Sequence, residues 1–213
     1  EFFKGDSAPD CLPRMPDIRR RLARRVALLH STKLPKMDQK PYFLKNLEEG
    51  IYAKEIEKKV SKTNYEEHEK KMINEIREQL LSKEEINFIR SILPTDPESI
   101  TFSHNDLHGG NIIYLEEEDE YIFIDFEYSS YNYRAFDIAN LFIEAMLDYE
   151  HDKHPWYKVN DEDYPTQREI EEFVRYYVFC TLLGDQLSNE DFSKALENPE
   201  YINEHLKKTG KFS

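Results

Sequence analysis

Three oxygen-bearing side chains, Asp106, Asn111 and Asp125, lie in one short segment whose residue types suit phosphate chemistry. Asp106 and Asn111 belong to the stretch HNDLHGGN, and Asp125 belongs to the extended run FIDFE that follows. Magnesium prefers hard oxygen donors and keeps waters or substrate phosphates in its other positions. An amide and a carboxylate from neighbouring strand ends therefore suit a metal-nucleotide site. Asp106 is not needed as a ligand, so it is free to accept or orient a hydroxyl proton.

A simpler interpretation of Asp106 and Asn111 is that they shape a turn, as Asp and Asn often do. The catalytic interpretation is favoured because His104 precedes the pair, β-rich segments flank it, and FIDFE follows at hairpin distance. The roles are then those found in protein kinases, in which one acid orients the nucleophile and two further side chains bind the metal. His104 is either a functional base or, as we favour, a residue that holds backbone in place.

Short extended segments are expected to carry this loop. The hydrophobic period changes from helical to extended at Ile100, and residues 100–103, 111–115 and 121–126 read as strands. The acidic tip at residues 116–120 joins the last two, so the two oxygen ligands converge across one hairpin.

Helical periodicity dominates the rest of the chain. We expect helices over residues 16–30, 137–148 and 168–183, and a charged helical layer over residues 48–93. Asp137 is expected to cap the helix that it opens. The fold class is therefore α+β and mostly helical.

Composition excludes several classes of partner. The formal charge of -14 disfavours binding to nucleic acid or to an anionic membrane. The basic run at residues 19–25 is interpreted as a solvated helix face, because an apolar stripe accompanies it: Ile18, Leu22, Val26 and Leu29. No apolar run approaches the roughly 20 residues that span a bilayer, so membrane insertion is not expected. Cys11 and Cys180 have no partner at redox or zinc-ligand spacing, which indicates a reducing, cytoplasmic compartment.

Two motifs, SHNDLHGGNIIY and FIDFEYSSYNYRAFDIANLFIEAMLDY, closely resemble the choline/ethanolamine kinase family. MPDIRRRLARRVALLH is similar to the family's helix after the interlobe linker, and DKHPWYKVNDEDYPT is similar to its later aromatic loop. The resemblance implies a protein-kinase-like C-terminal lobe, mostly helical, with a small β-hairpin or sheet that carries the catalytic loop. It also implies phosphoryl transfer from ATP, with Mg2+, to the hydroxyl of a small amino alcohol, with choline favoured over ethanolamine.

Carried over residue by residue, the resemblance makes Asp106 the catalytic base, and makes Asn111 and Asp125 the ligands of magnesium and of the nucleotide phosphates. It assigns four further residues to contacts with the amino alcohol: Tyr128, Glu144, Tyr149 and His108. This set is chemically reasonable, because a quaternary ammonium has no N–H donor and is best held by aromatic faces and nearby negative charge.

Purely structural interpretations of these positions remain as alternatives. Tyr128 and Tyr149 could be half-buried packing residues, and Glu144 could be an ordinary exposed acid on a helix. Trp156, the single tryptophan, is interpreted as a packing anchor in a Pro-flanked loop.

The chain also departs from the family pattern. It has no G-x-G-x-x-G motif, so the nucleotide-covering N-terminal lobe is expected to be absent from it. We expect residues 1–15 to be an interlobe linker, 16–187 the C-terminal lobe, and 188–213 a polar helical tail. Nothing after Tyr177 matches the family's late helix with cage-closing tryptophans. An ethanolamine kinase and a non-catalytic, kinase-derived structural subunit therefore remain as alternatives, and a homodimer is left open.

Overall fold

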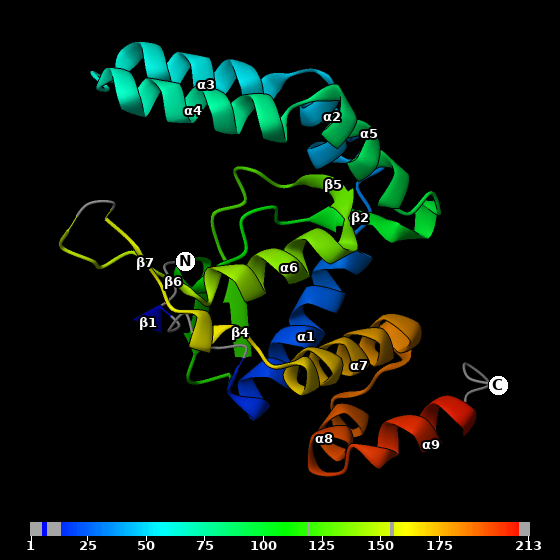
Figure 1. Ribbon diagram of the computed structural model, residues 1–213. Coiled ribbons are helices and arrows are strands. Elements are labelled where there is room, and N and C mark those ends of the chain that lie inside the picture. The colour runs from blue at the N-terminus through cyan, green and yellow to red at the C-terminus, as the bar shows by residue number, and fades with distance from the viewer. Residues whose placement is uncertain (1–5, 8–13, 119, 154–155, 209–213) are drawn as a thin grey trace.

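The computed structural model describes residues 6–7, 14–118, 120–153 and 156–208, and these fold into a helix-rich α+β structure, as predicted (Figure 1). The helices are α1 (Pro16–Ser31), α2 (Tyr42–Glu48), α3 (Ile51–Lys62), α4 (Glu67–Leu80), α5 (Lys83–Ile92), α6 (Arg134–Glu144), α7 (Gln167–Leu183), α8 (Asn189–Glu197) and α9 (Glu200–Lys208). The strands are β1 (Asp6–Ser7), β2 (Ile100–Ser103), β3 (Ile112–Leu115), β4 (Glu120–Phe123), β5 (Ser130–Tyr133), β6 (Leu147–Asp148) and β7 (Lys158–Val159).

The strands form small antiparallel sheets. β3 pairs with β4 as the predicted hairpin, with Ile112 opposite Phe123, and β1 adds to its other edge. β2 instead pairs with β5, a strand that the sequence did not predict, and β6 pairs with β7. The segment between β2 and β3, which holds Asp106, therefore connects two different sheets.

The predicted strand over residues 121–126 is too long at its C-terminal end. Strand β4 stops at Phe123, and Asp125 adopts a left-handed backbone conformation with φ 60°. A left-handed residue cannot continue a β-ladder, although Asp tolerates this conformation better than most residues. The chain therefore turns where the predicted ligand lies.

The main core lies where α1 packs on α7 and β4. α1 contributes Leu22 and Val26, which are fully buried, and α7 contributes Phe173 and Tyr176. The apolar sides of α8 and α9 join the same core through residues such as Ile202, which is 1% exposed. In Figure 1 these two helices lie at one end of the molecule, and the pair α3 and α4 lies at the other. The boundaries proposed at residues 15 and 187 remain predictions.

The prediction that the arginines of α1 lie on solvated faces is wrong for Arg19. Its side chain is only 4% exposed, because α1 lies against the acidic start of α7. Its Nε donates to Oε2 of Glu172 at 2.9 Å, and its Nη1 lies 3.2 Å from Oε1 of Glu169. Arg20 also donates to Glu172, at 2.7 Å from Nε to Oε1. This part of the basic run is an internal ion-pair network.

The predicted start of the helix over residues 137–148 is also wrong. Helix α6 begins at Arg134, so Asp137 lies inside its first turns and not at its N-cap. Asp137 is fully buried and binds elsewhere, as described below. Among the described residues, the helices are too short or too polar to span a bilayer.

Candidate active site

The buried carboxylate of Asp137 holds the backbone of the loop between β2 and β3 by hydrogen bonds. Its Oδ2 accepts a hydrogen bond from the backbone N–H of His104 at 2.7 Å, and its Oδ1 accepts one from the N–H of Asn105 at 2.8 Å. His30 of α1 contacts the same carboxylate, at 3.1 Å from Nε2 to Oδ2. Asn140 of α6 adds a bond to the carbonyl of Leu107 at 3.2 Å. Helix α6 thus fixes the backbone on both sides of Asp106.

Asparagines tie this loop to the turn after β4. Asn105, which has φ 68°, donates from Nδ2 to the carbonyl of Tyr128 at 2.9 Å. Fully buried Asn132 on β5 donates to Oδ1 of Asn105 at 2.8 Å. Sequence reasoning missed both asparagines, although an Asn in the middle of a short strand is an unusual residue choice that could have indicated a buried polar contact.

Asp106 and Asn111 are brought together by hydrogen bonds. The Nδ2 of Asn111 donates to the backbone carbonyl of Asp106 at 2.9 Å and to its Oδ2 at 3.2 Å. A carbonyl oxygen can only accept, so the amide nitrogen of Asn111 must face Asp106. The amide oxygen of Asn111 then points the other way, and it makes no hydrogen bond within the described residues.

Asp125 lies beside Asn111 across the hairpin. The N–H of Ile124 donates to the carbonyl of Asn111 at 3.0 Å, which extends the pairing of β3 with β4 by one step. Asp125 is exposed. Within the described residues, no hydrogen bond or ion pair engages its carboxylate.

The donor set at this place fits a magnesium ion. Asn111 offers a free amide oxygen and Asp125 a free carboxylate, and both are hard oxygen donors. No cluster of at least three His, Cys, Asp or Glu side chains suited to a metal occurs in the described part of the chain. The site would therefore bind magnesium with few protein ligands and leave positions for phosphates and water, as is usual for this ion.

His108 caps the short turn Gly109–Asn111 beside Asp106. Its Nδ1 accepts from the N–H of Gly110 at 3.1 Å, so a neutral His108 carries its proton on Nε2. That nitrogen lies 3.8 Å from Oδ2 of Asp106, which is too far for a hydrogen bond. His108 thus presents an N–H toward the carboxylate without occupying it.

The predicted amino-alcohol residues fall into two groups. Glu144 and Tyr149 contact each other, because the Tyr149 hydroxyl donates to Oε2 of Glu144 at 3.0 Å. Tyr128 lies with Asp106 in a cleft of about 690 Å³ whose opposite wall comes from α2 and α3. Negative charge on Glu127 and, more weakly, on Asp106 raises the pKa of the Tyr128 hydroxyl. Tyr128 is 47% exposed and Tyr149 is 58% exposed, so a large part of each ring is accessible to a ligand.

His104 and Trp156 have different outcomes. His104 is fully buried, lies against Phe123 and Phe126, and contacts the carbonyl of Ile124 at 2.8 Å from Nε2. These contacts agree with a backbone-holding role. Trp156 is 64% exposed, so the packing interpretation is wrong for it, because its loop carries the ring outward.

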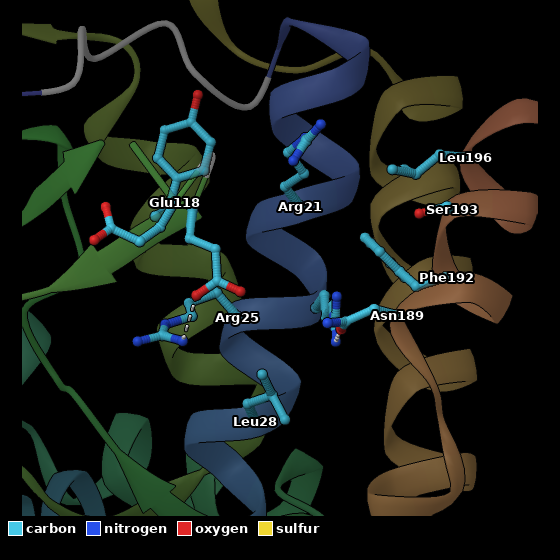
Figure 2. A pocket seen from close by; sticks show the side chains of 11 residues that line it. Arg21, Arg25, Leu28, Glu118, Asn189, Phe192, Ser193 and Leu196 are labelled. Atoms are coloured by element: carbon cyan, nitrogen blue, oxygen red, sulfur yellow. Dashed lines mark hydrogen bonds and ion pairs between the residues drawn. The ribbon is translucent and has the colours of Figure 1, made fainter. Parts of the chain in front are cut away.

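A second hollow, of about 270 Å³, lies between α1, the β3–β4 hairpin and α8 (Figure 2). Its basic side chains are engaged within the protein. Arg25 lies 3.8 Å from Glu120, and Arg24 donates to Asn189 at 2.5 Å and stacks over Phe192. This hollow is a seam between packed elements, whereas the cleft at Asp106 is lined by two of the predicted site residues, Asp106 and Tyr128.

Comparison with known proteins identifies relatives of this chain. A family model described as choline/ethanolamine kinase matches residues 1–204. Human choline/ethanolamine kinase is 43% identical over 119 residues, which are 54% of this chain and 30% of that protein. Mouse choline kinase alpha is 35% identical over 185 residues, which are 84% of this chain and 39% of that protein. The chain thus spans 30% to 39% of the length of these two relatives.

Solved structures resemble the fold. A choline kinase from Cryptosporidium parvum matches with a TM-score of 0.65 and 26% identity, over 92% of this chain and 59% of that one. A Plasmodium vivax ethanolamine kinase matches with a TM-score of 0.58 and 20% identity, over 95% of this chain and 62% of that one. The fold is therefore kinase-like, rich in helices and with small sheets. The expected absence of an N-terminal lobe stays a prediction.

Proposed function

Because this chain belongs to the choline/ethanolamine kinase family, we propose that it takes part in phosphoryl transfer from ATP to the hydroxyl of a small amino alcohol. The observation that supports the proposal is the placement of Asp106, Asn111 and Asp125 on the loop after β2 and on the hairpin that follows it. The first two are joined by a hydrogen bond, and the third lies one step further along the same hairpin.

Asp106 acts as the catalytic base in this proposal. Its carboxylate is partly exposed at the cleft, and its backbone is fixed by the bonds from Asn111. The carboxylate accepts the hydroxyl proton as the alcohol oxygen bonds to the γ-phosphorus, and the bond from that phosphorus to the leaving ADP oxygen breaks. A rigid loop matters here, because positioning and electrostatic stabilisation supply nearly all the catalysis of phosphoryl transfer.

Asn111 and Asp125 would hold the magnesium ion through their free oxygens. When bound, the ion neutralises charge on the nucleotide phosphates. The Nδ2 bonds of Asn111 to Asp106 keep its amide oxygen turned toward the ion side. Asn111 thereby links the metal site to the base.

The amino alcohol is assigned to Tyr128 at the cleft and to the separate pair of Glu144 and Tyr149. Tyr128 stands beside Asp106, and Glu144 and Tyr149 add a carboxylate with a bonded phenol. His108 presents its Nε2 side toward Asp106 and completes the polar surroundings of the substrate. We propose choline as the acceptor, because an aromatic and acidic surface suits a quaternary ammonium. Ethanolamine is the alternative, since its ammonium could also donate to Glu144.

The test is ATP-dependent phosphorylation of choline and of ethanolamine by the full-length protein and by Asp106→Asn. Removing a general base costs about 10²–10⁴-fold in rate, so we expect a loss of that size in kcat. Asp161→Asn, an exposed acid on another turn, is the matched control and should retain activity. Absence of turnover with both amines would refute the function, and full activity of Asp106→Asn would refute the assignment of the base.

A further inference from the structure

One face of helix α3 forms a wall of the cleft opposite the proposed catalytic base. Its residues follow helical spacing, so they project in one direction. The α3 residues that line the cleft are Tyr52, Glu55, Lys58, Lys59 and Lys62. On the other side of the same cleft lie Asn105, Asp106 and Tyr128.

The three lysines of this wall have no hydrogen-bond or ion-pair partner for their ammonium groups within the described residues. Neighbouring lysines behave differently. Lys45 contacts Asp38 at 3.0 Å, Lys40 contacts Glu48 at 3.0 Å, and Lys70 contacts Glu67 at 2.9 Å. The whole protein has 43 acidic and 29 basic residues, so acidic partners are abundant. The ammonium groups of Lys58, Lys59 and Lys62 are therefore available to bind an anion at this cleft.

The two walls share one electrostatic environment. Besides Glu127 and Asp106, Glu55 of α3 and Tyr42 of α2 contribute to raising the pKa of the Tyr128 hydroxyl. Glu55 is the single acid that α3 contributes to the cleft lining, against three lysines. The α3 wall therefore carries net positive charge facing the proposed base. That net charge favours an anion over a small cation such as choline.

We propose that Lys58, Lys59 and Lys62 form a phosphate-binding surface in this cleft, one that receives the phosphate groups of the nucleotide or of the phosphorylated product. The inference rests on the proposed function, and it adds cations from α3 to the acid and amide ligands of the β3–β4 hairpin. Lysine suits this task, because its ammonium is a compact point charge on a flexible stem. The three lysines outnumber the two acids of the lining, Glu55 and Asp106, so the α3 side of the cleft attracts anions.

The first experiment measures binding by calorimetry with inorganic tripolyphosphate, MgADP, phosphocholine and choline. The test protein is the full-length Lys58→Gln, Lys59→Gln, Lys62→Gln triple variant. The matched control replaces the exposed lysines Lys33, Lys36 and Lys83 by Gln, which changes the net charge equally and leaves the cleft unaltered.

Each exposed charge contact is expected to change affinity about two- to five-fold, so the triple variant should bind the phosphate probes at least about eight-fold more weakly than the control. Choline binding should stay within about two-fold. MgADP and phosphocholine distinguish the source of the phosphate, because the probe that loses affinity is the one that contacts α3. The effect should shrink as salt rises, since the screening length falls to about 3 Å at 1 M.

The inference is overturned if the triple variant and the control bind every phosphate probe equally, or if the unaltered protein binds none of them. It is independent of the turnover assay. Loss of tripolyphosphate affinity in a protein that phosphorylates neither amine would support the lysine surface and refute the kinase function. Full turnover together with unchanged anion binding would do the reverse.

Discussion

Replacing Asp137 by Asn should loosen the proposed catalytic loop without altering any residue that lines the cleft. Asp137 is fully buried, and its two oxygens accept from the backbone N–H groups of His104 and Asn105. An asparagine has the same shape but only one acceptor oxygen. One of the two N–H groups must then face an NH2 group and lose its partner.

The size of the effect follows from these bonds. A buried donor left unsatisfied costs about 1–3 kcal/mol. Each remaining hydrogen bond then has a neutral acceptor in place of a charged one, so its contribution to stability falls from about 1.5–3 kcal/mol to about 1 kcal/mol. Removing a buried negative charge offsets part of this loss, because the charge no longer has to be desolvated. We therefore expect Asp137→Asn to lower the free energy of unfolding by about 2–3 kcal/mol.

Urea unfolding measures this change, and amide hydrogen exchange locates it. The N–H of His104 or of Asn105 should exchange faster in the variant, while amides of α7 should change only as much as global stability does. Asp161→Asn is again the control, because that acid is exposed. A free energy of unfolding within about 0.5 kcal/mol of the unaltered protein, with both loop amides still protected, would refute the bracing role of Asp137.

Other consequences can be checked at separate places in the fold. Burial acts to raise the pKa of Glu172, but hydrogen bonds from Arg19 and Arg20 lower it overall from its ordinary 4.5. The ion pairs of Glu172 stabilise the fold above that value, and this stabilisation is lost as pH falls through the lowered pKa. Urea unfolding should therefore show that Glu172→Gln is about 2 kcal/mol less stable than the unaltered protein at pH 7, and that the difference disappears below pH 4.5. Tyr149→Phe removes the hydrogen bond to Glu144. Initial-rate kinetics should then show that the KM for the amino alcohol rises about five-fold while kcat is almost unchanged. An unchanged KM would argue against this pair as a substrate contact. Burial raises the pKa of the Cys180 thiol to about 12, so peptide mapping after iodoacetamide treatment at pH 8 should find Cys180 unlabelled until urea unfolds the protein.

Much of the fold was accessible from local sequence patterns. Helix α1 ends one residue later than predicted, and α7 begins one residue earlier. Strand β2 covers the predicted residues, and the β3–β4 hairpin forms around the acidic tip. Apolar periodicity and turn residues act over a few positions, so they can be read without knowing the fold.

The errors arise where tertiary contacts decide. Strand β5 carries Asn132 in its buried middle, and that residue is stabilised by Asn105, a residue 27 positions earlier in the chain. Arg19 was expected on a solvated face, but it is buried because Glu169 and Glu172 lie opposite it on α7. No rule of local spacing connects such partners. A buried polar residue looks like a surface residue until its partner is located.

The polar layer under the loop explains why the segment from Phe102 to Asn140 behaves as one unit. Asp137 and Asn132 come from elements that follow the hairpin, yet they fix the backbone and side chain of Asn105 in the loop that precedes it. Apolar contacts tolerate small shifts, whereas hydrogen bonds in a low-dielectric interior are directional and costly to leave unmade. A loop held in this way is rigid at Asp106, while the side chain itself stays open to the cleft. The acids and amides of this segment therefore perform two tasks: Asp137, Asn132 and Asn105 fix the geometry of the loop, whereas the carboxylates of Asp106 and Asp125 stay accessible to solvent.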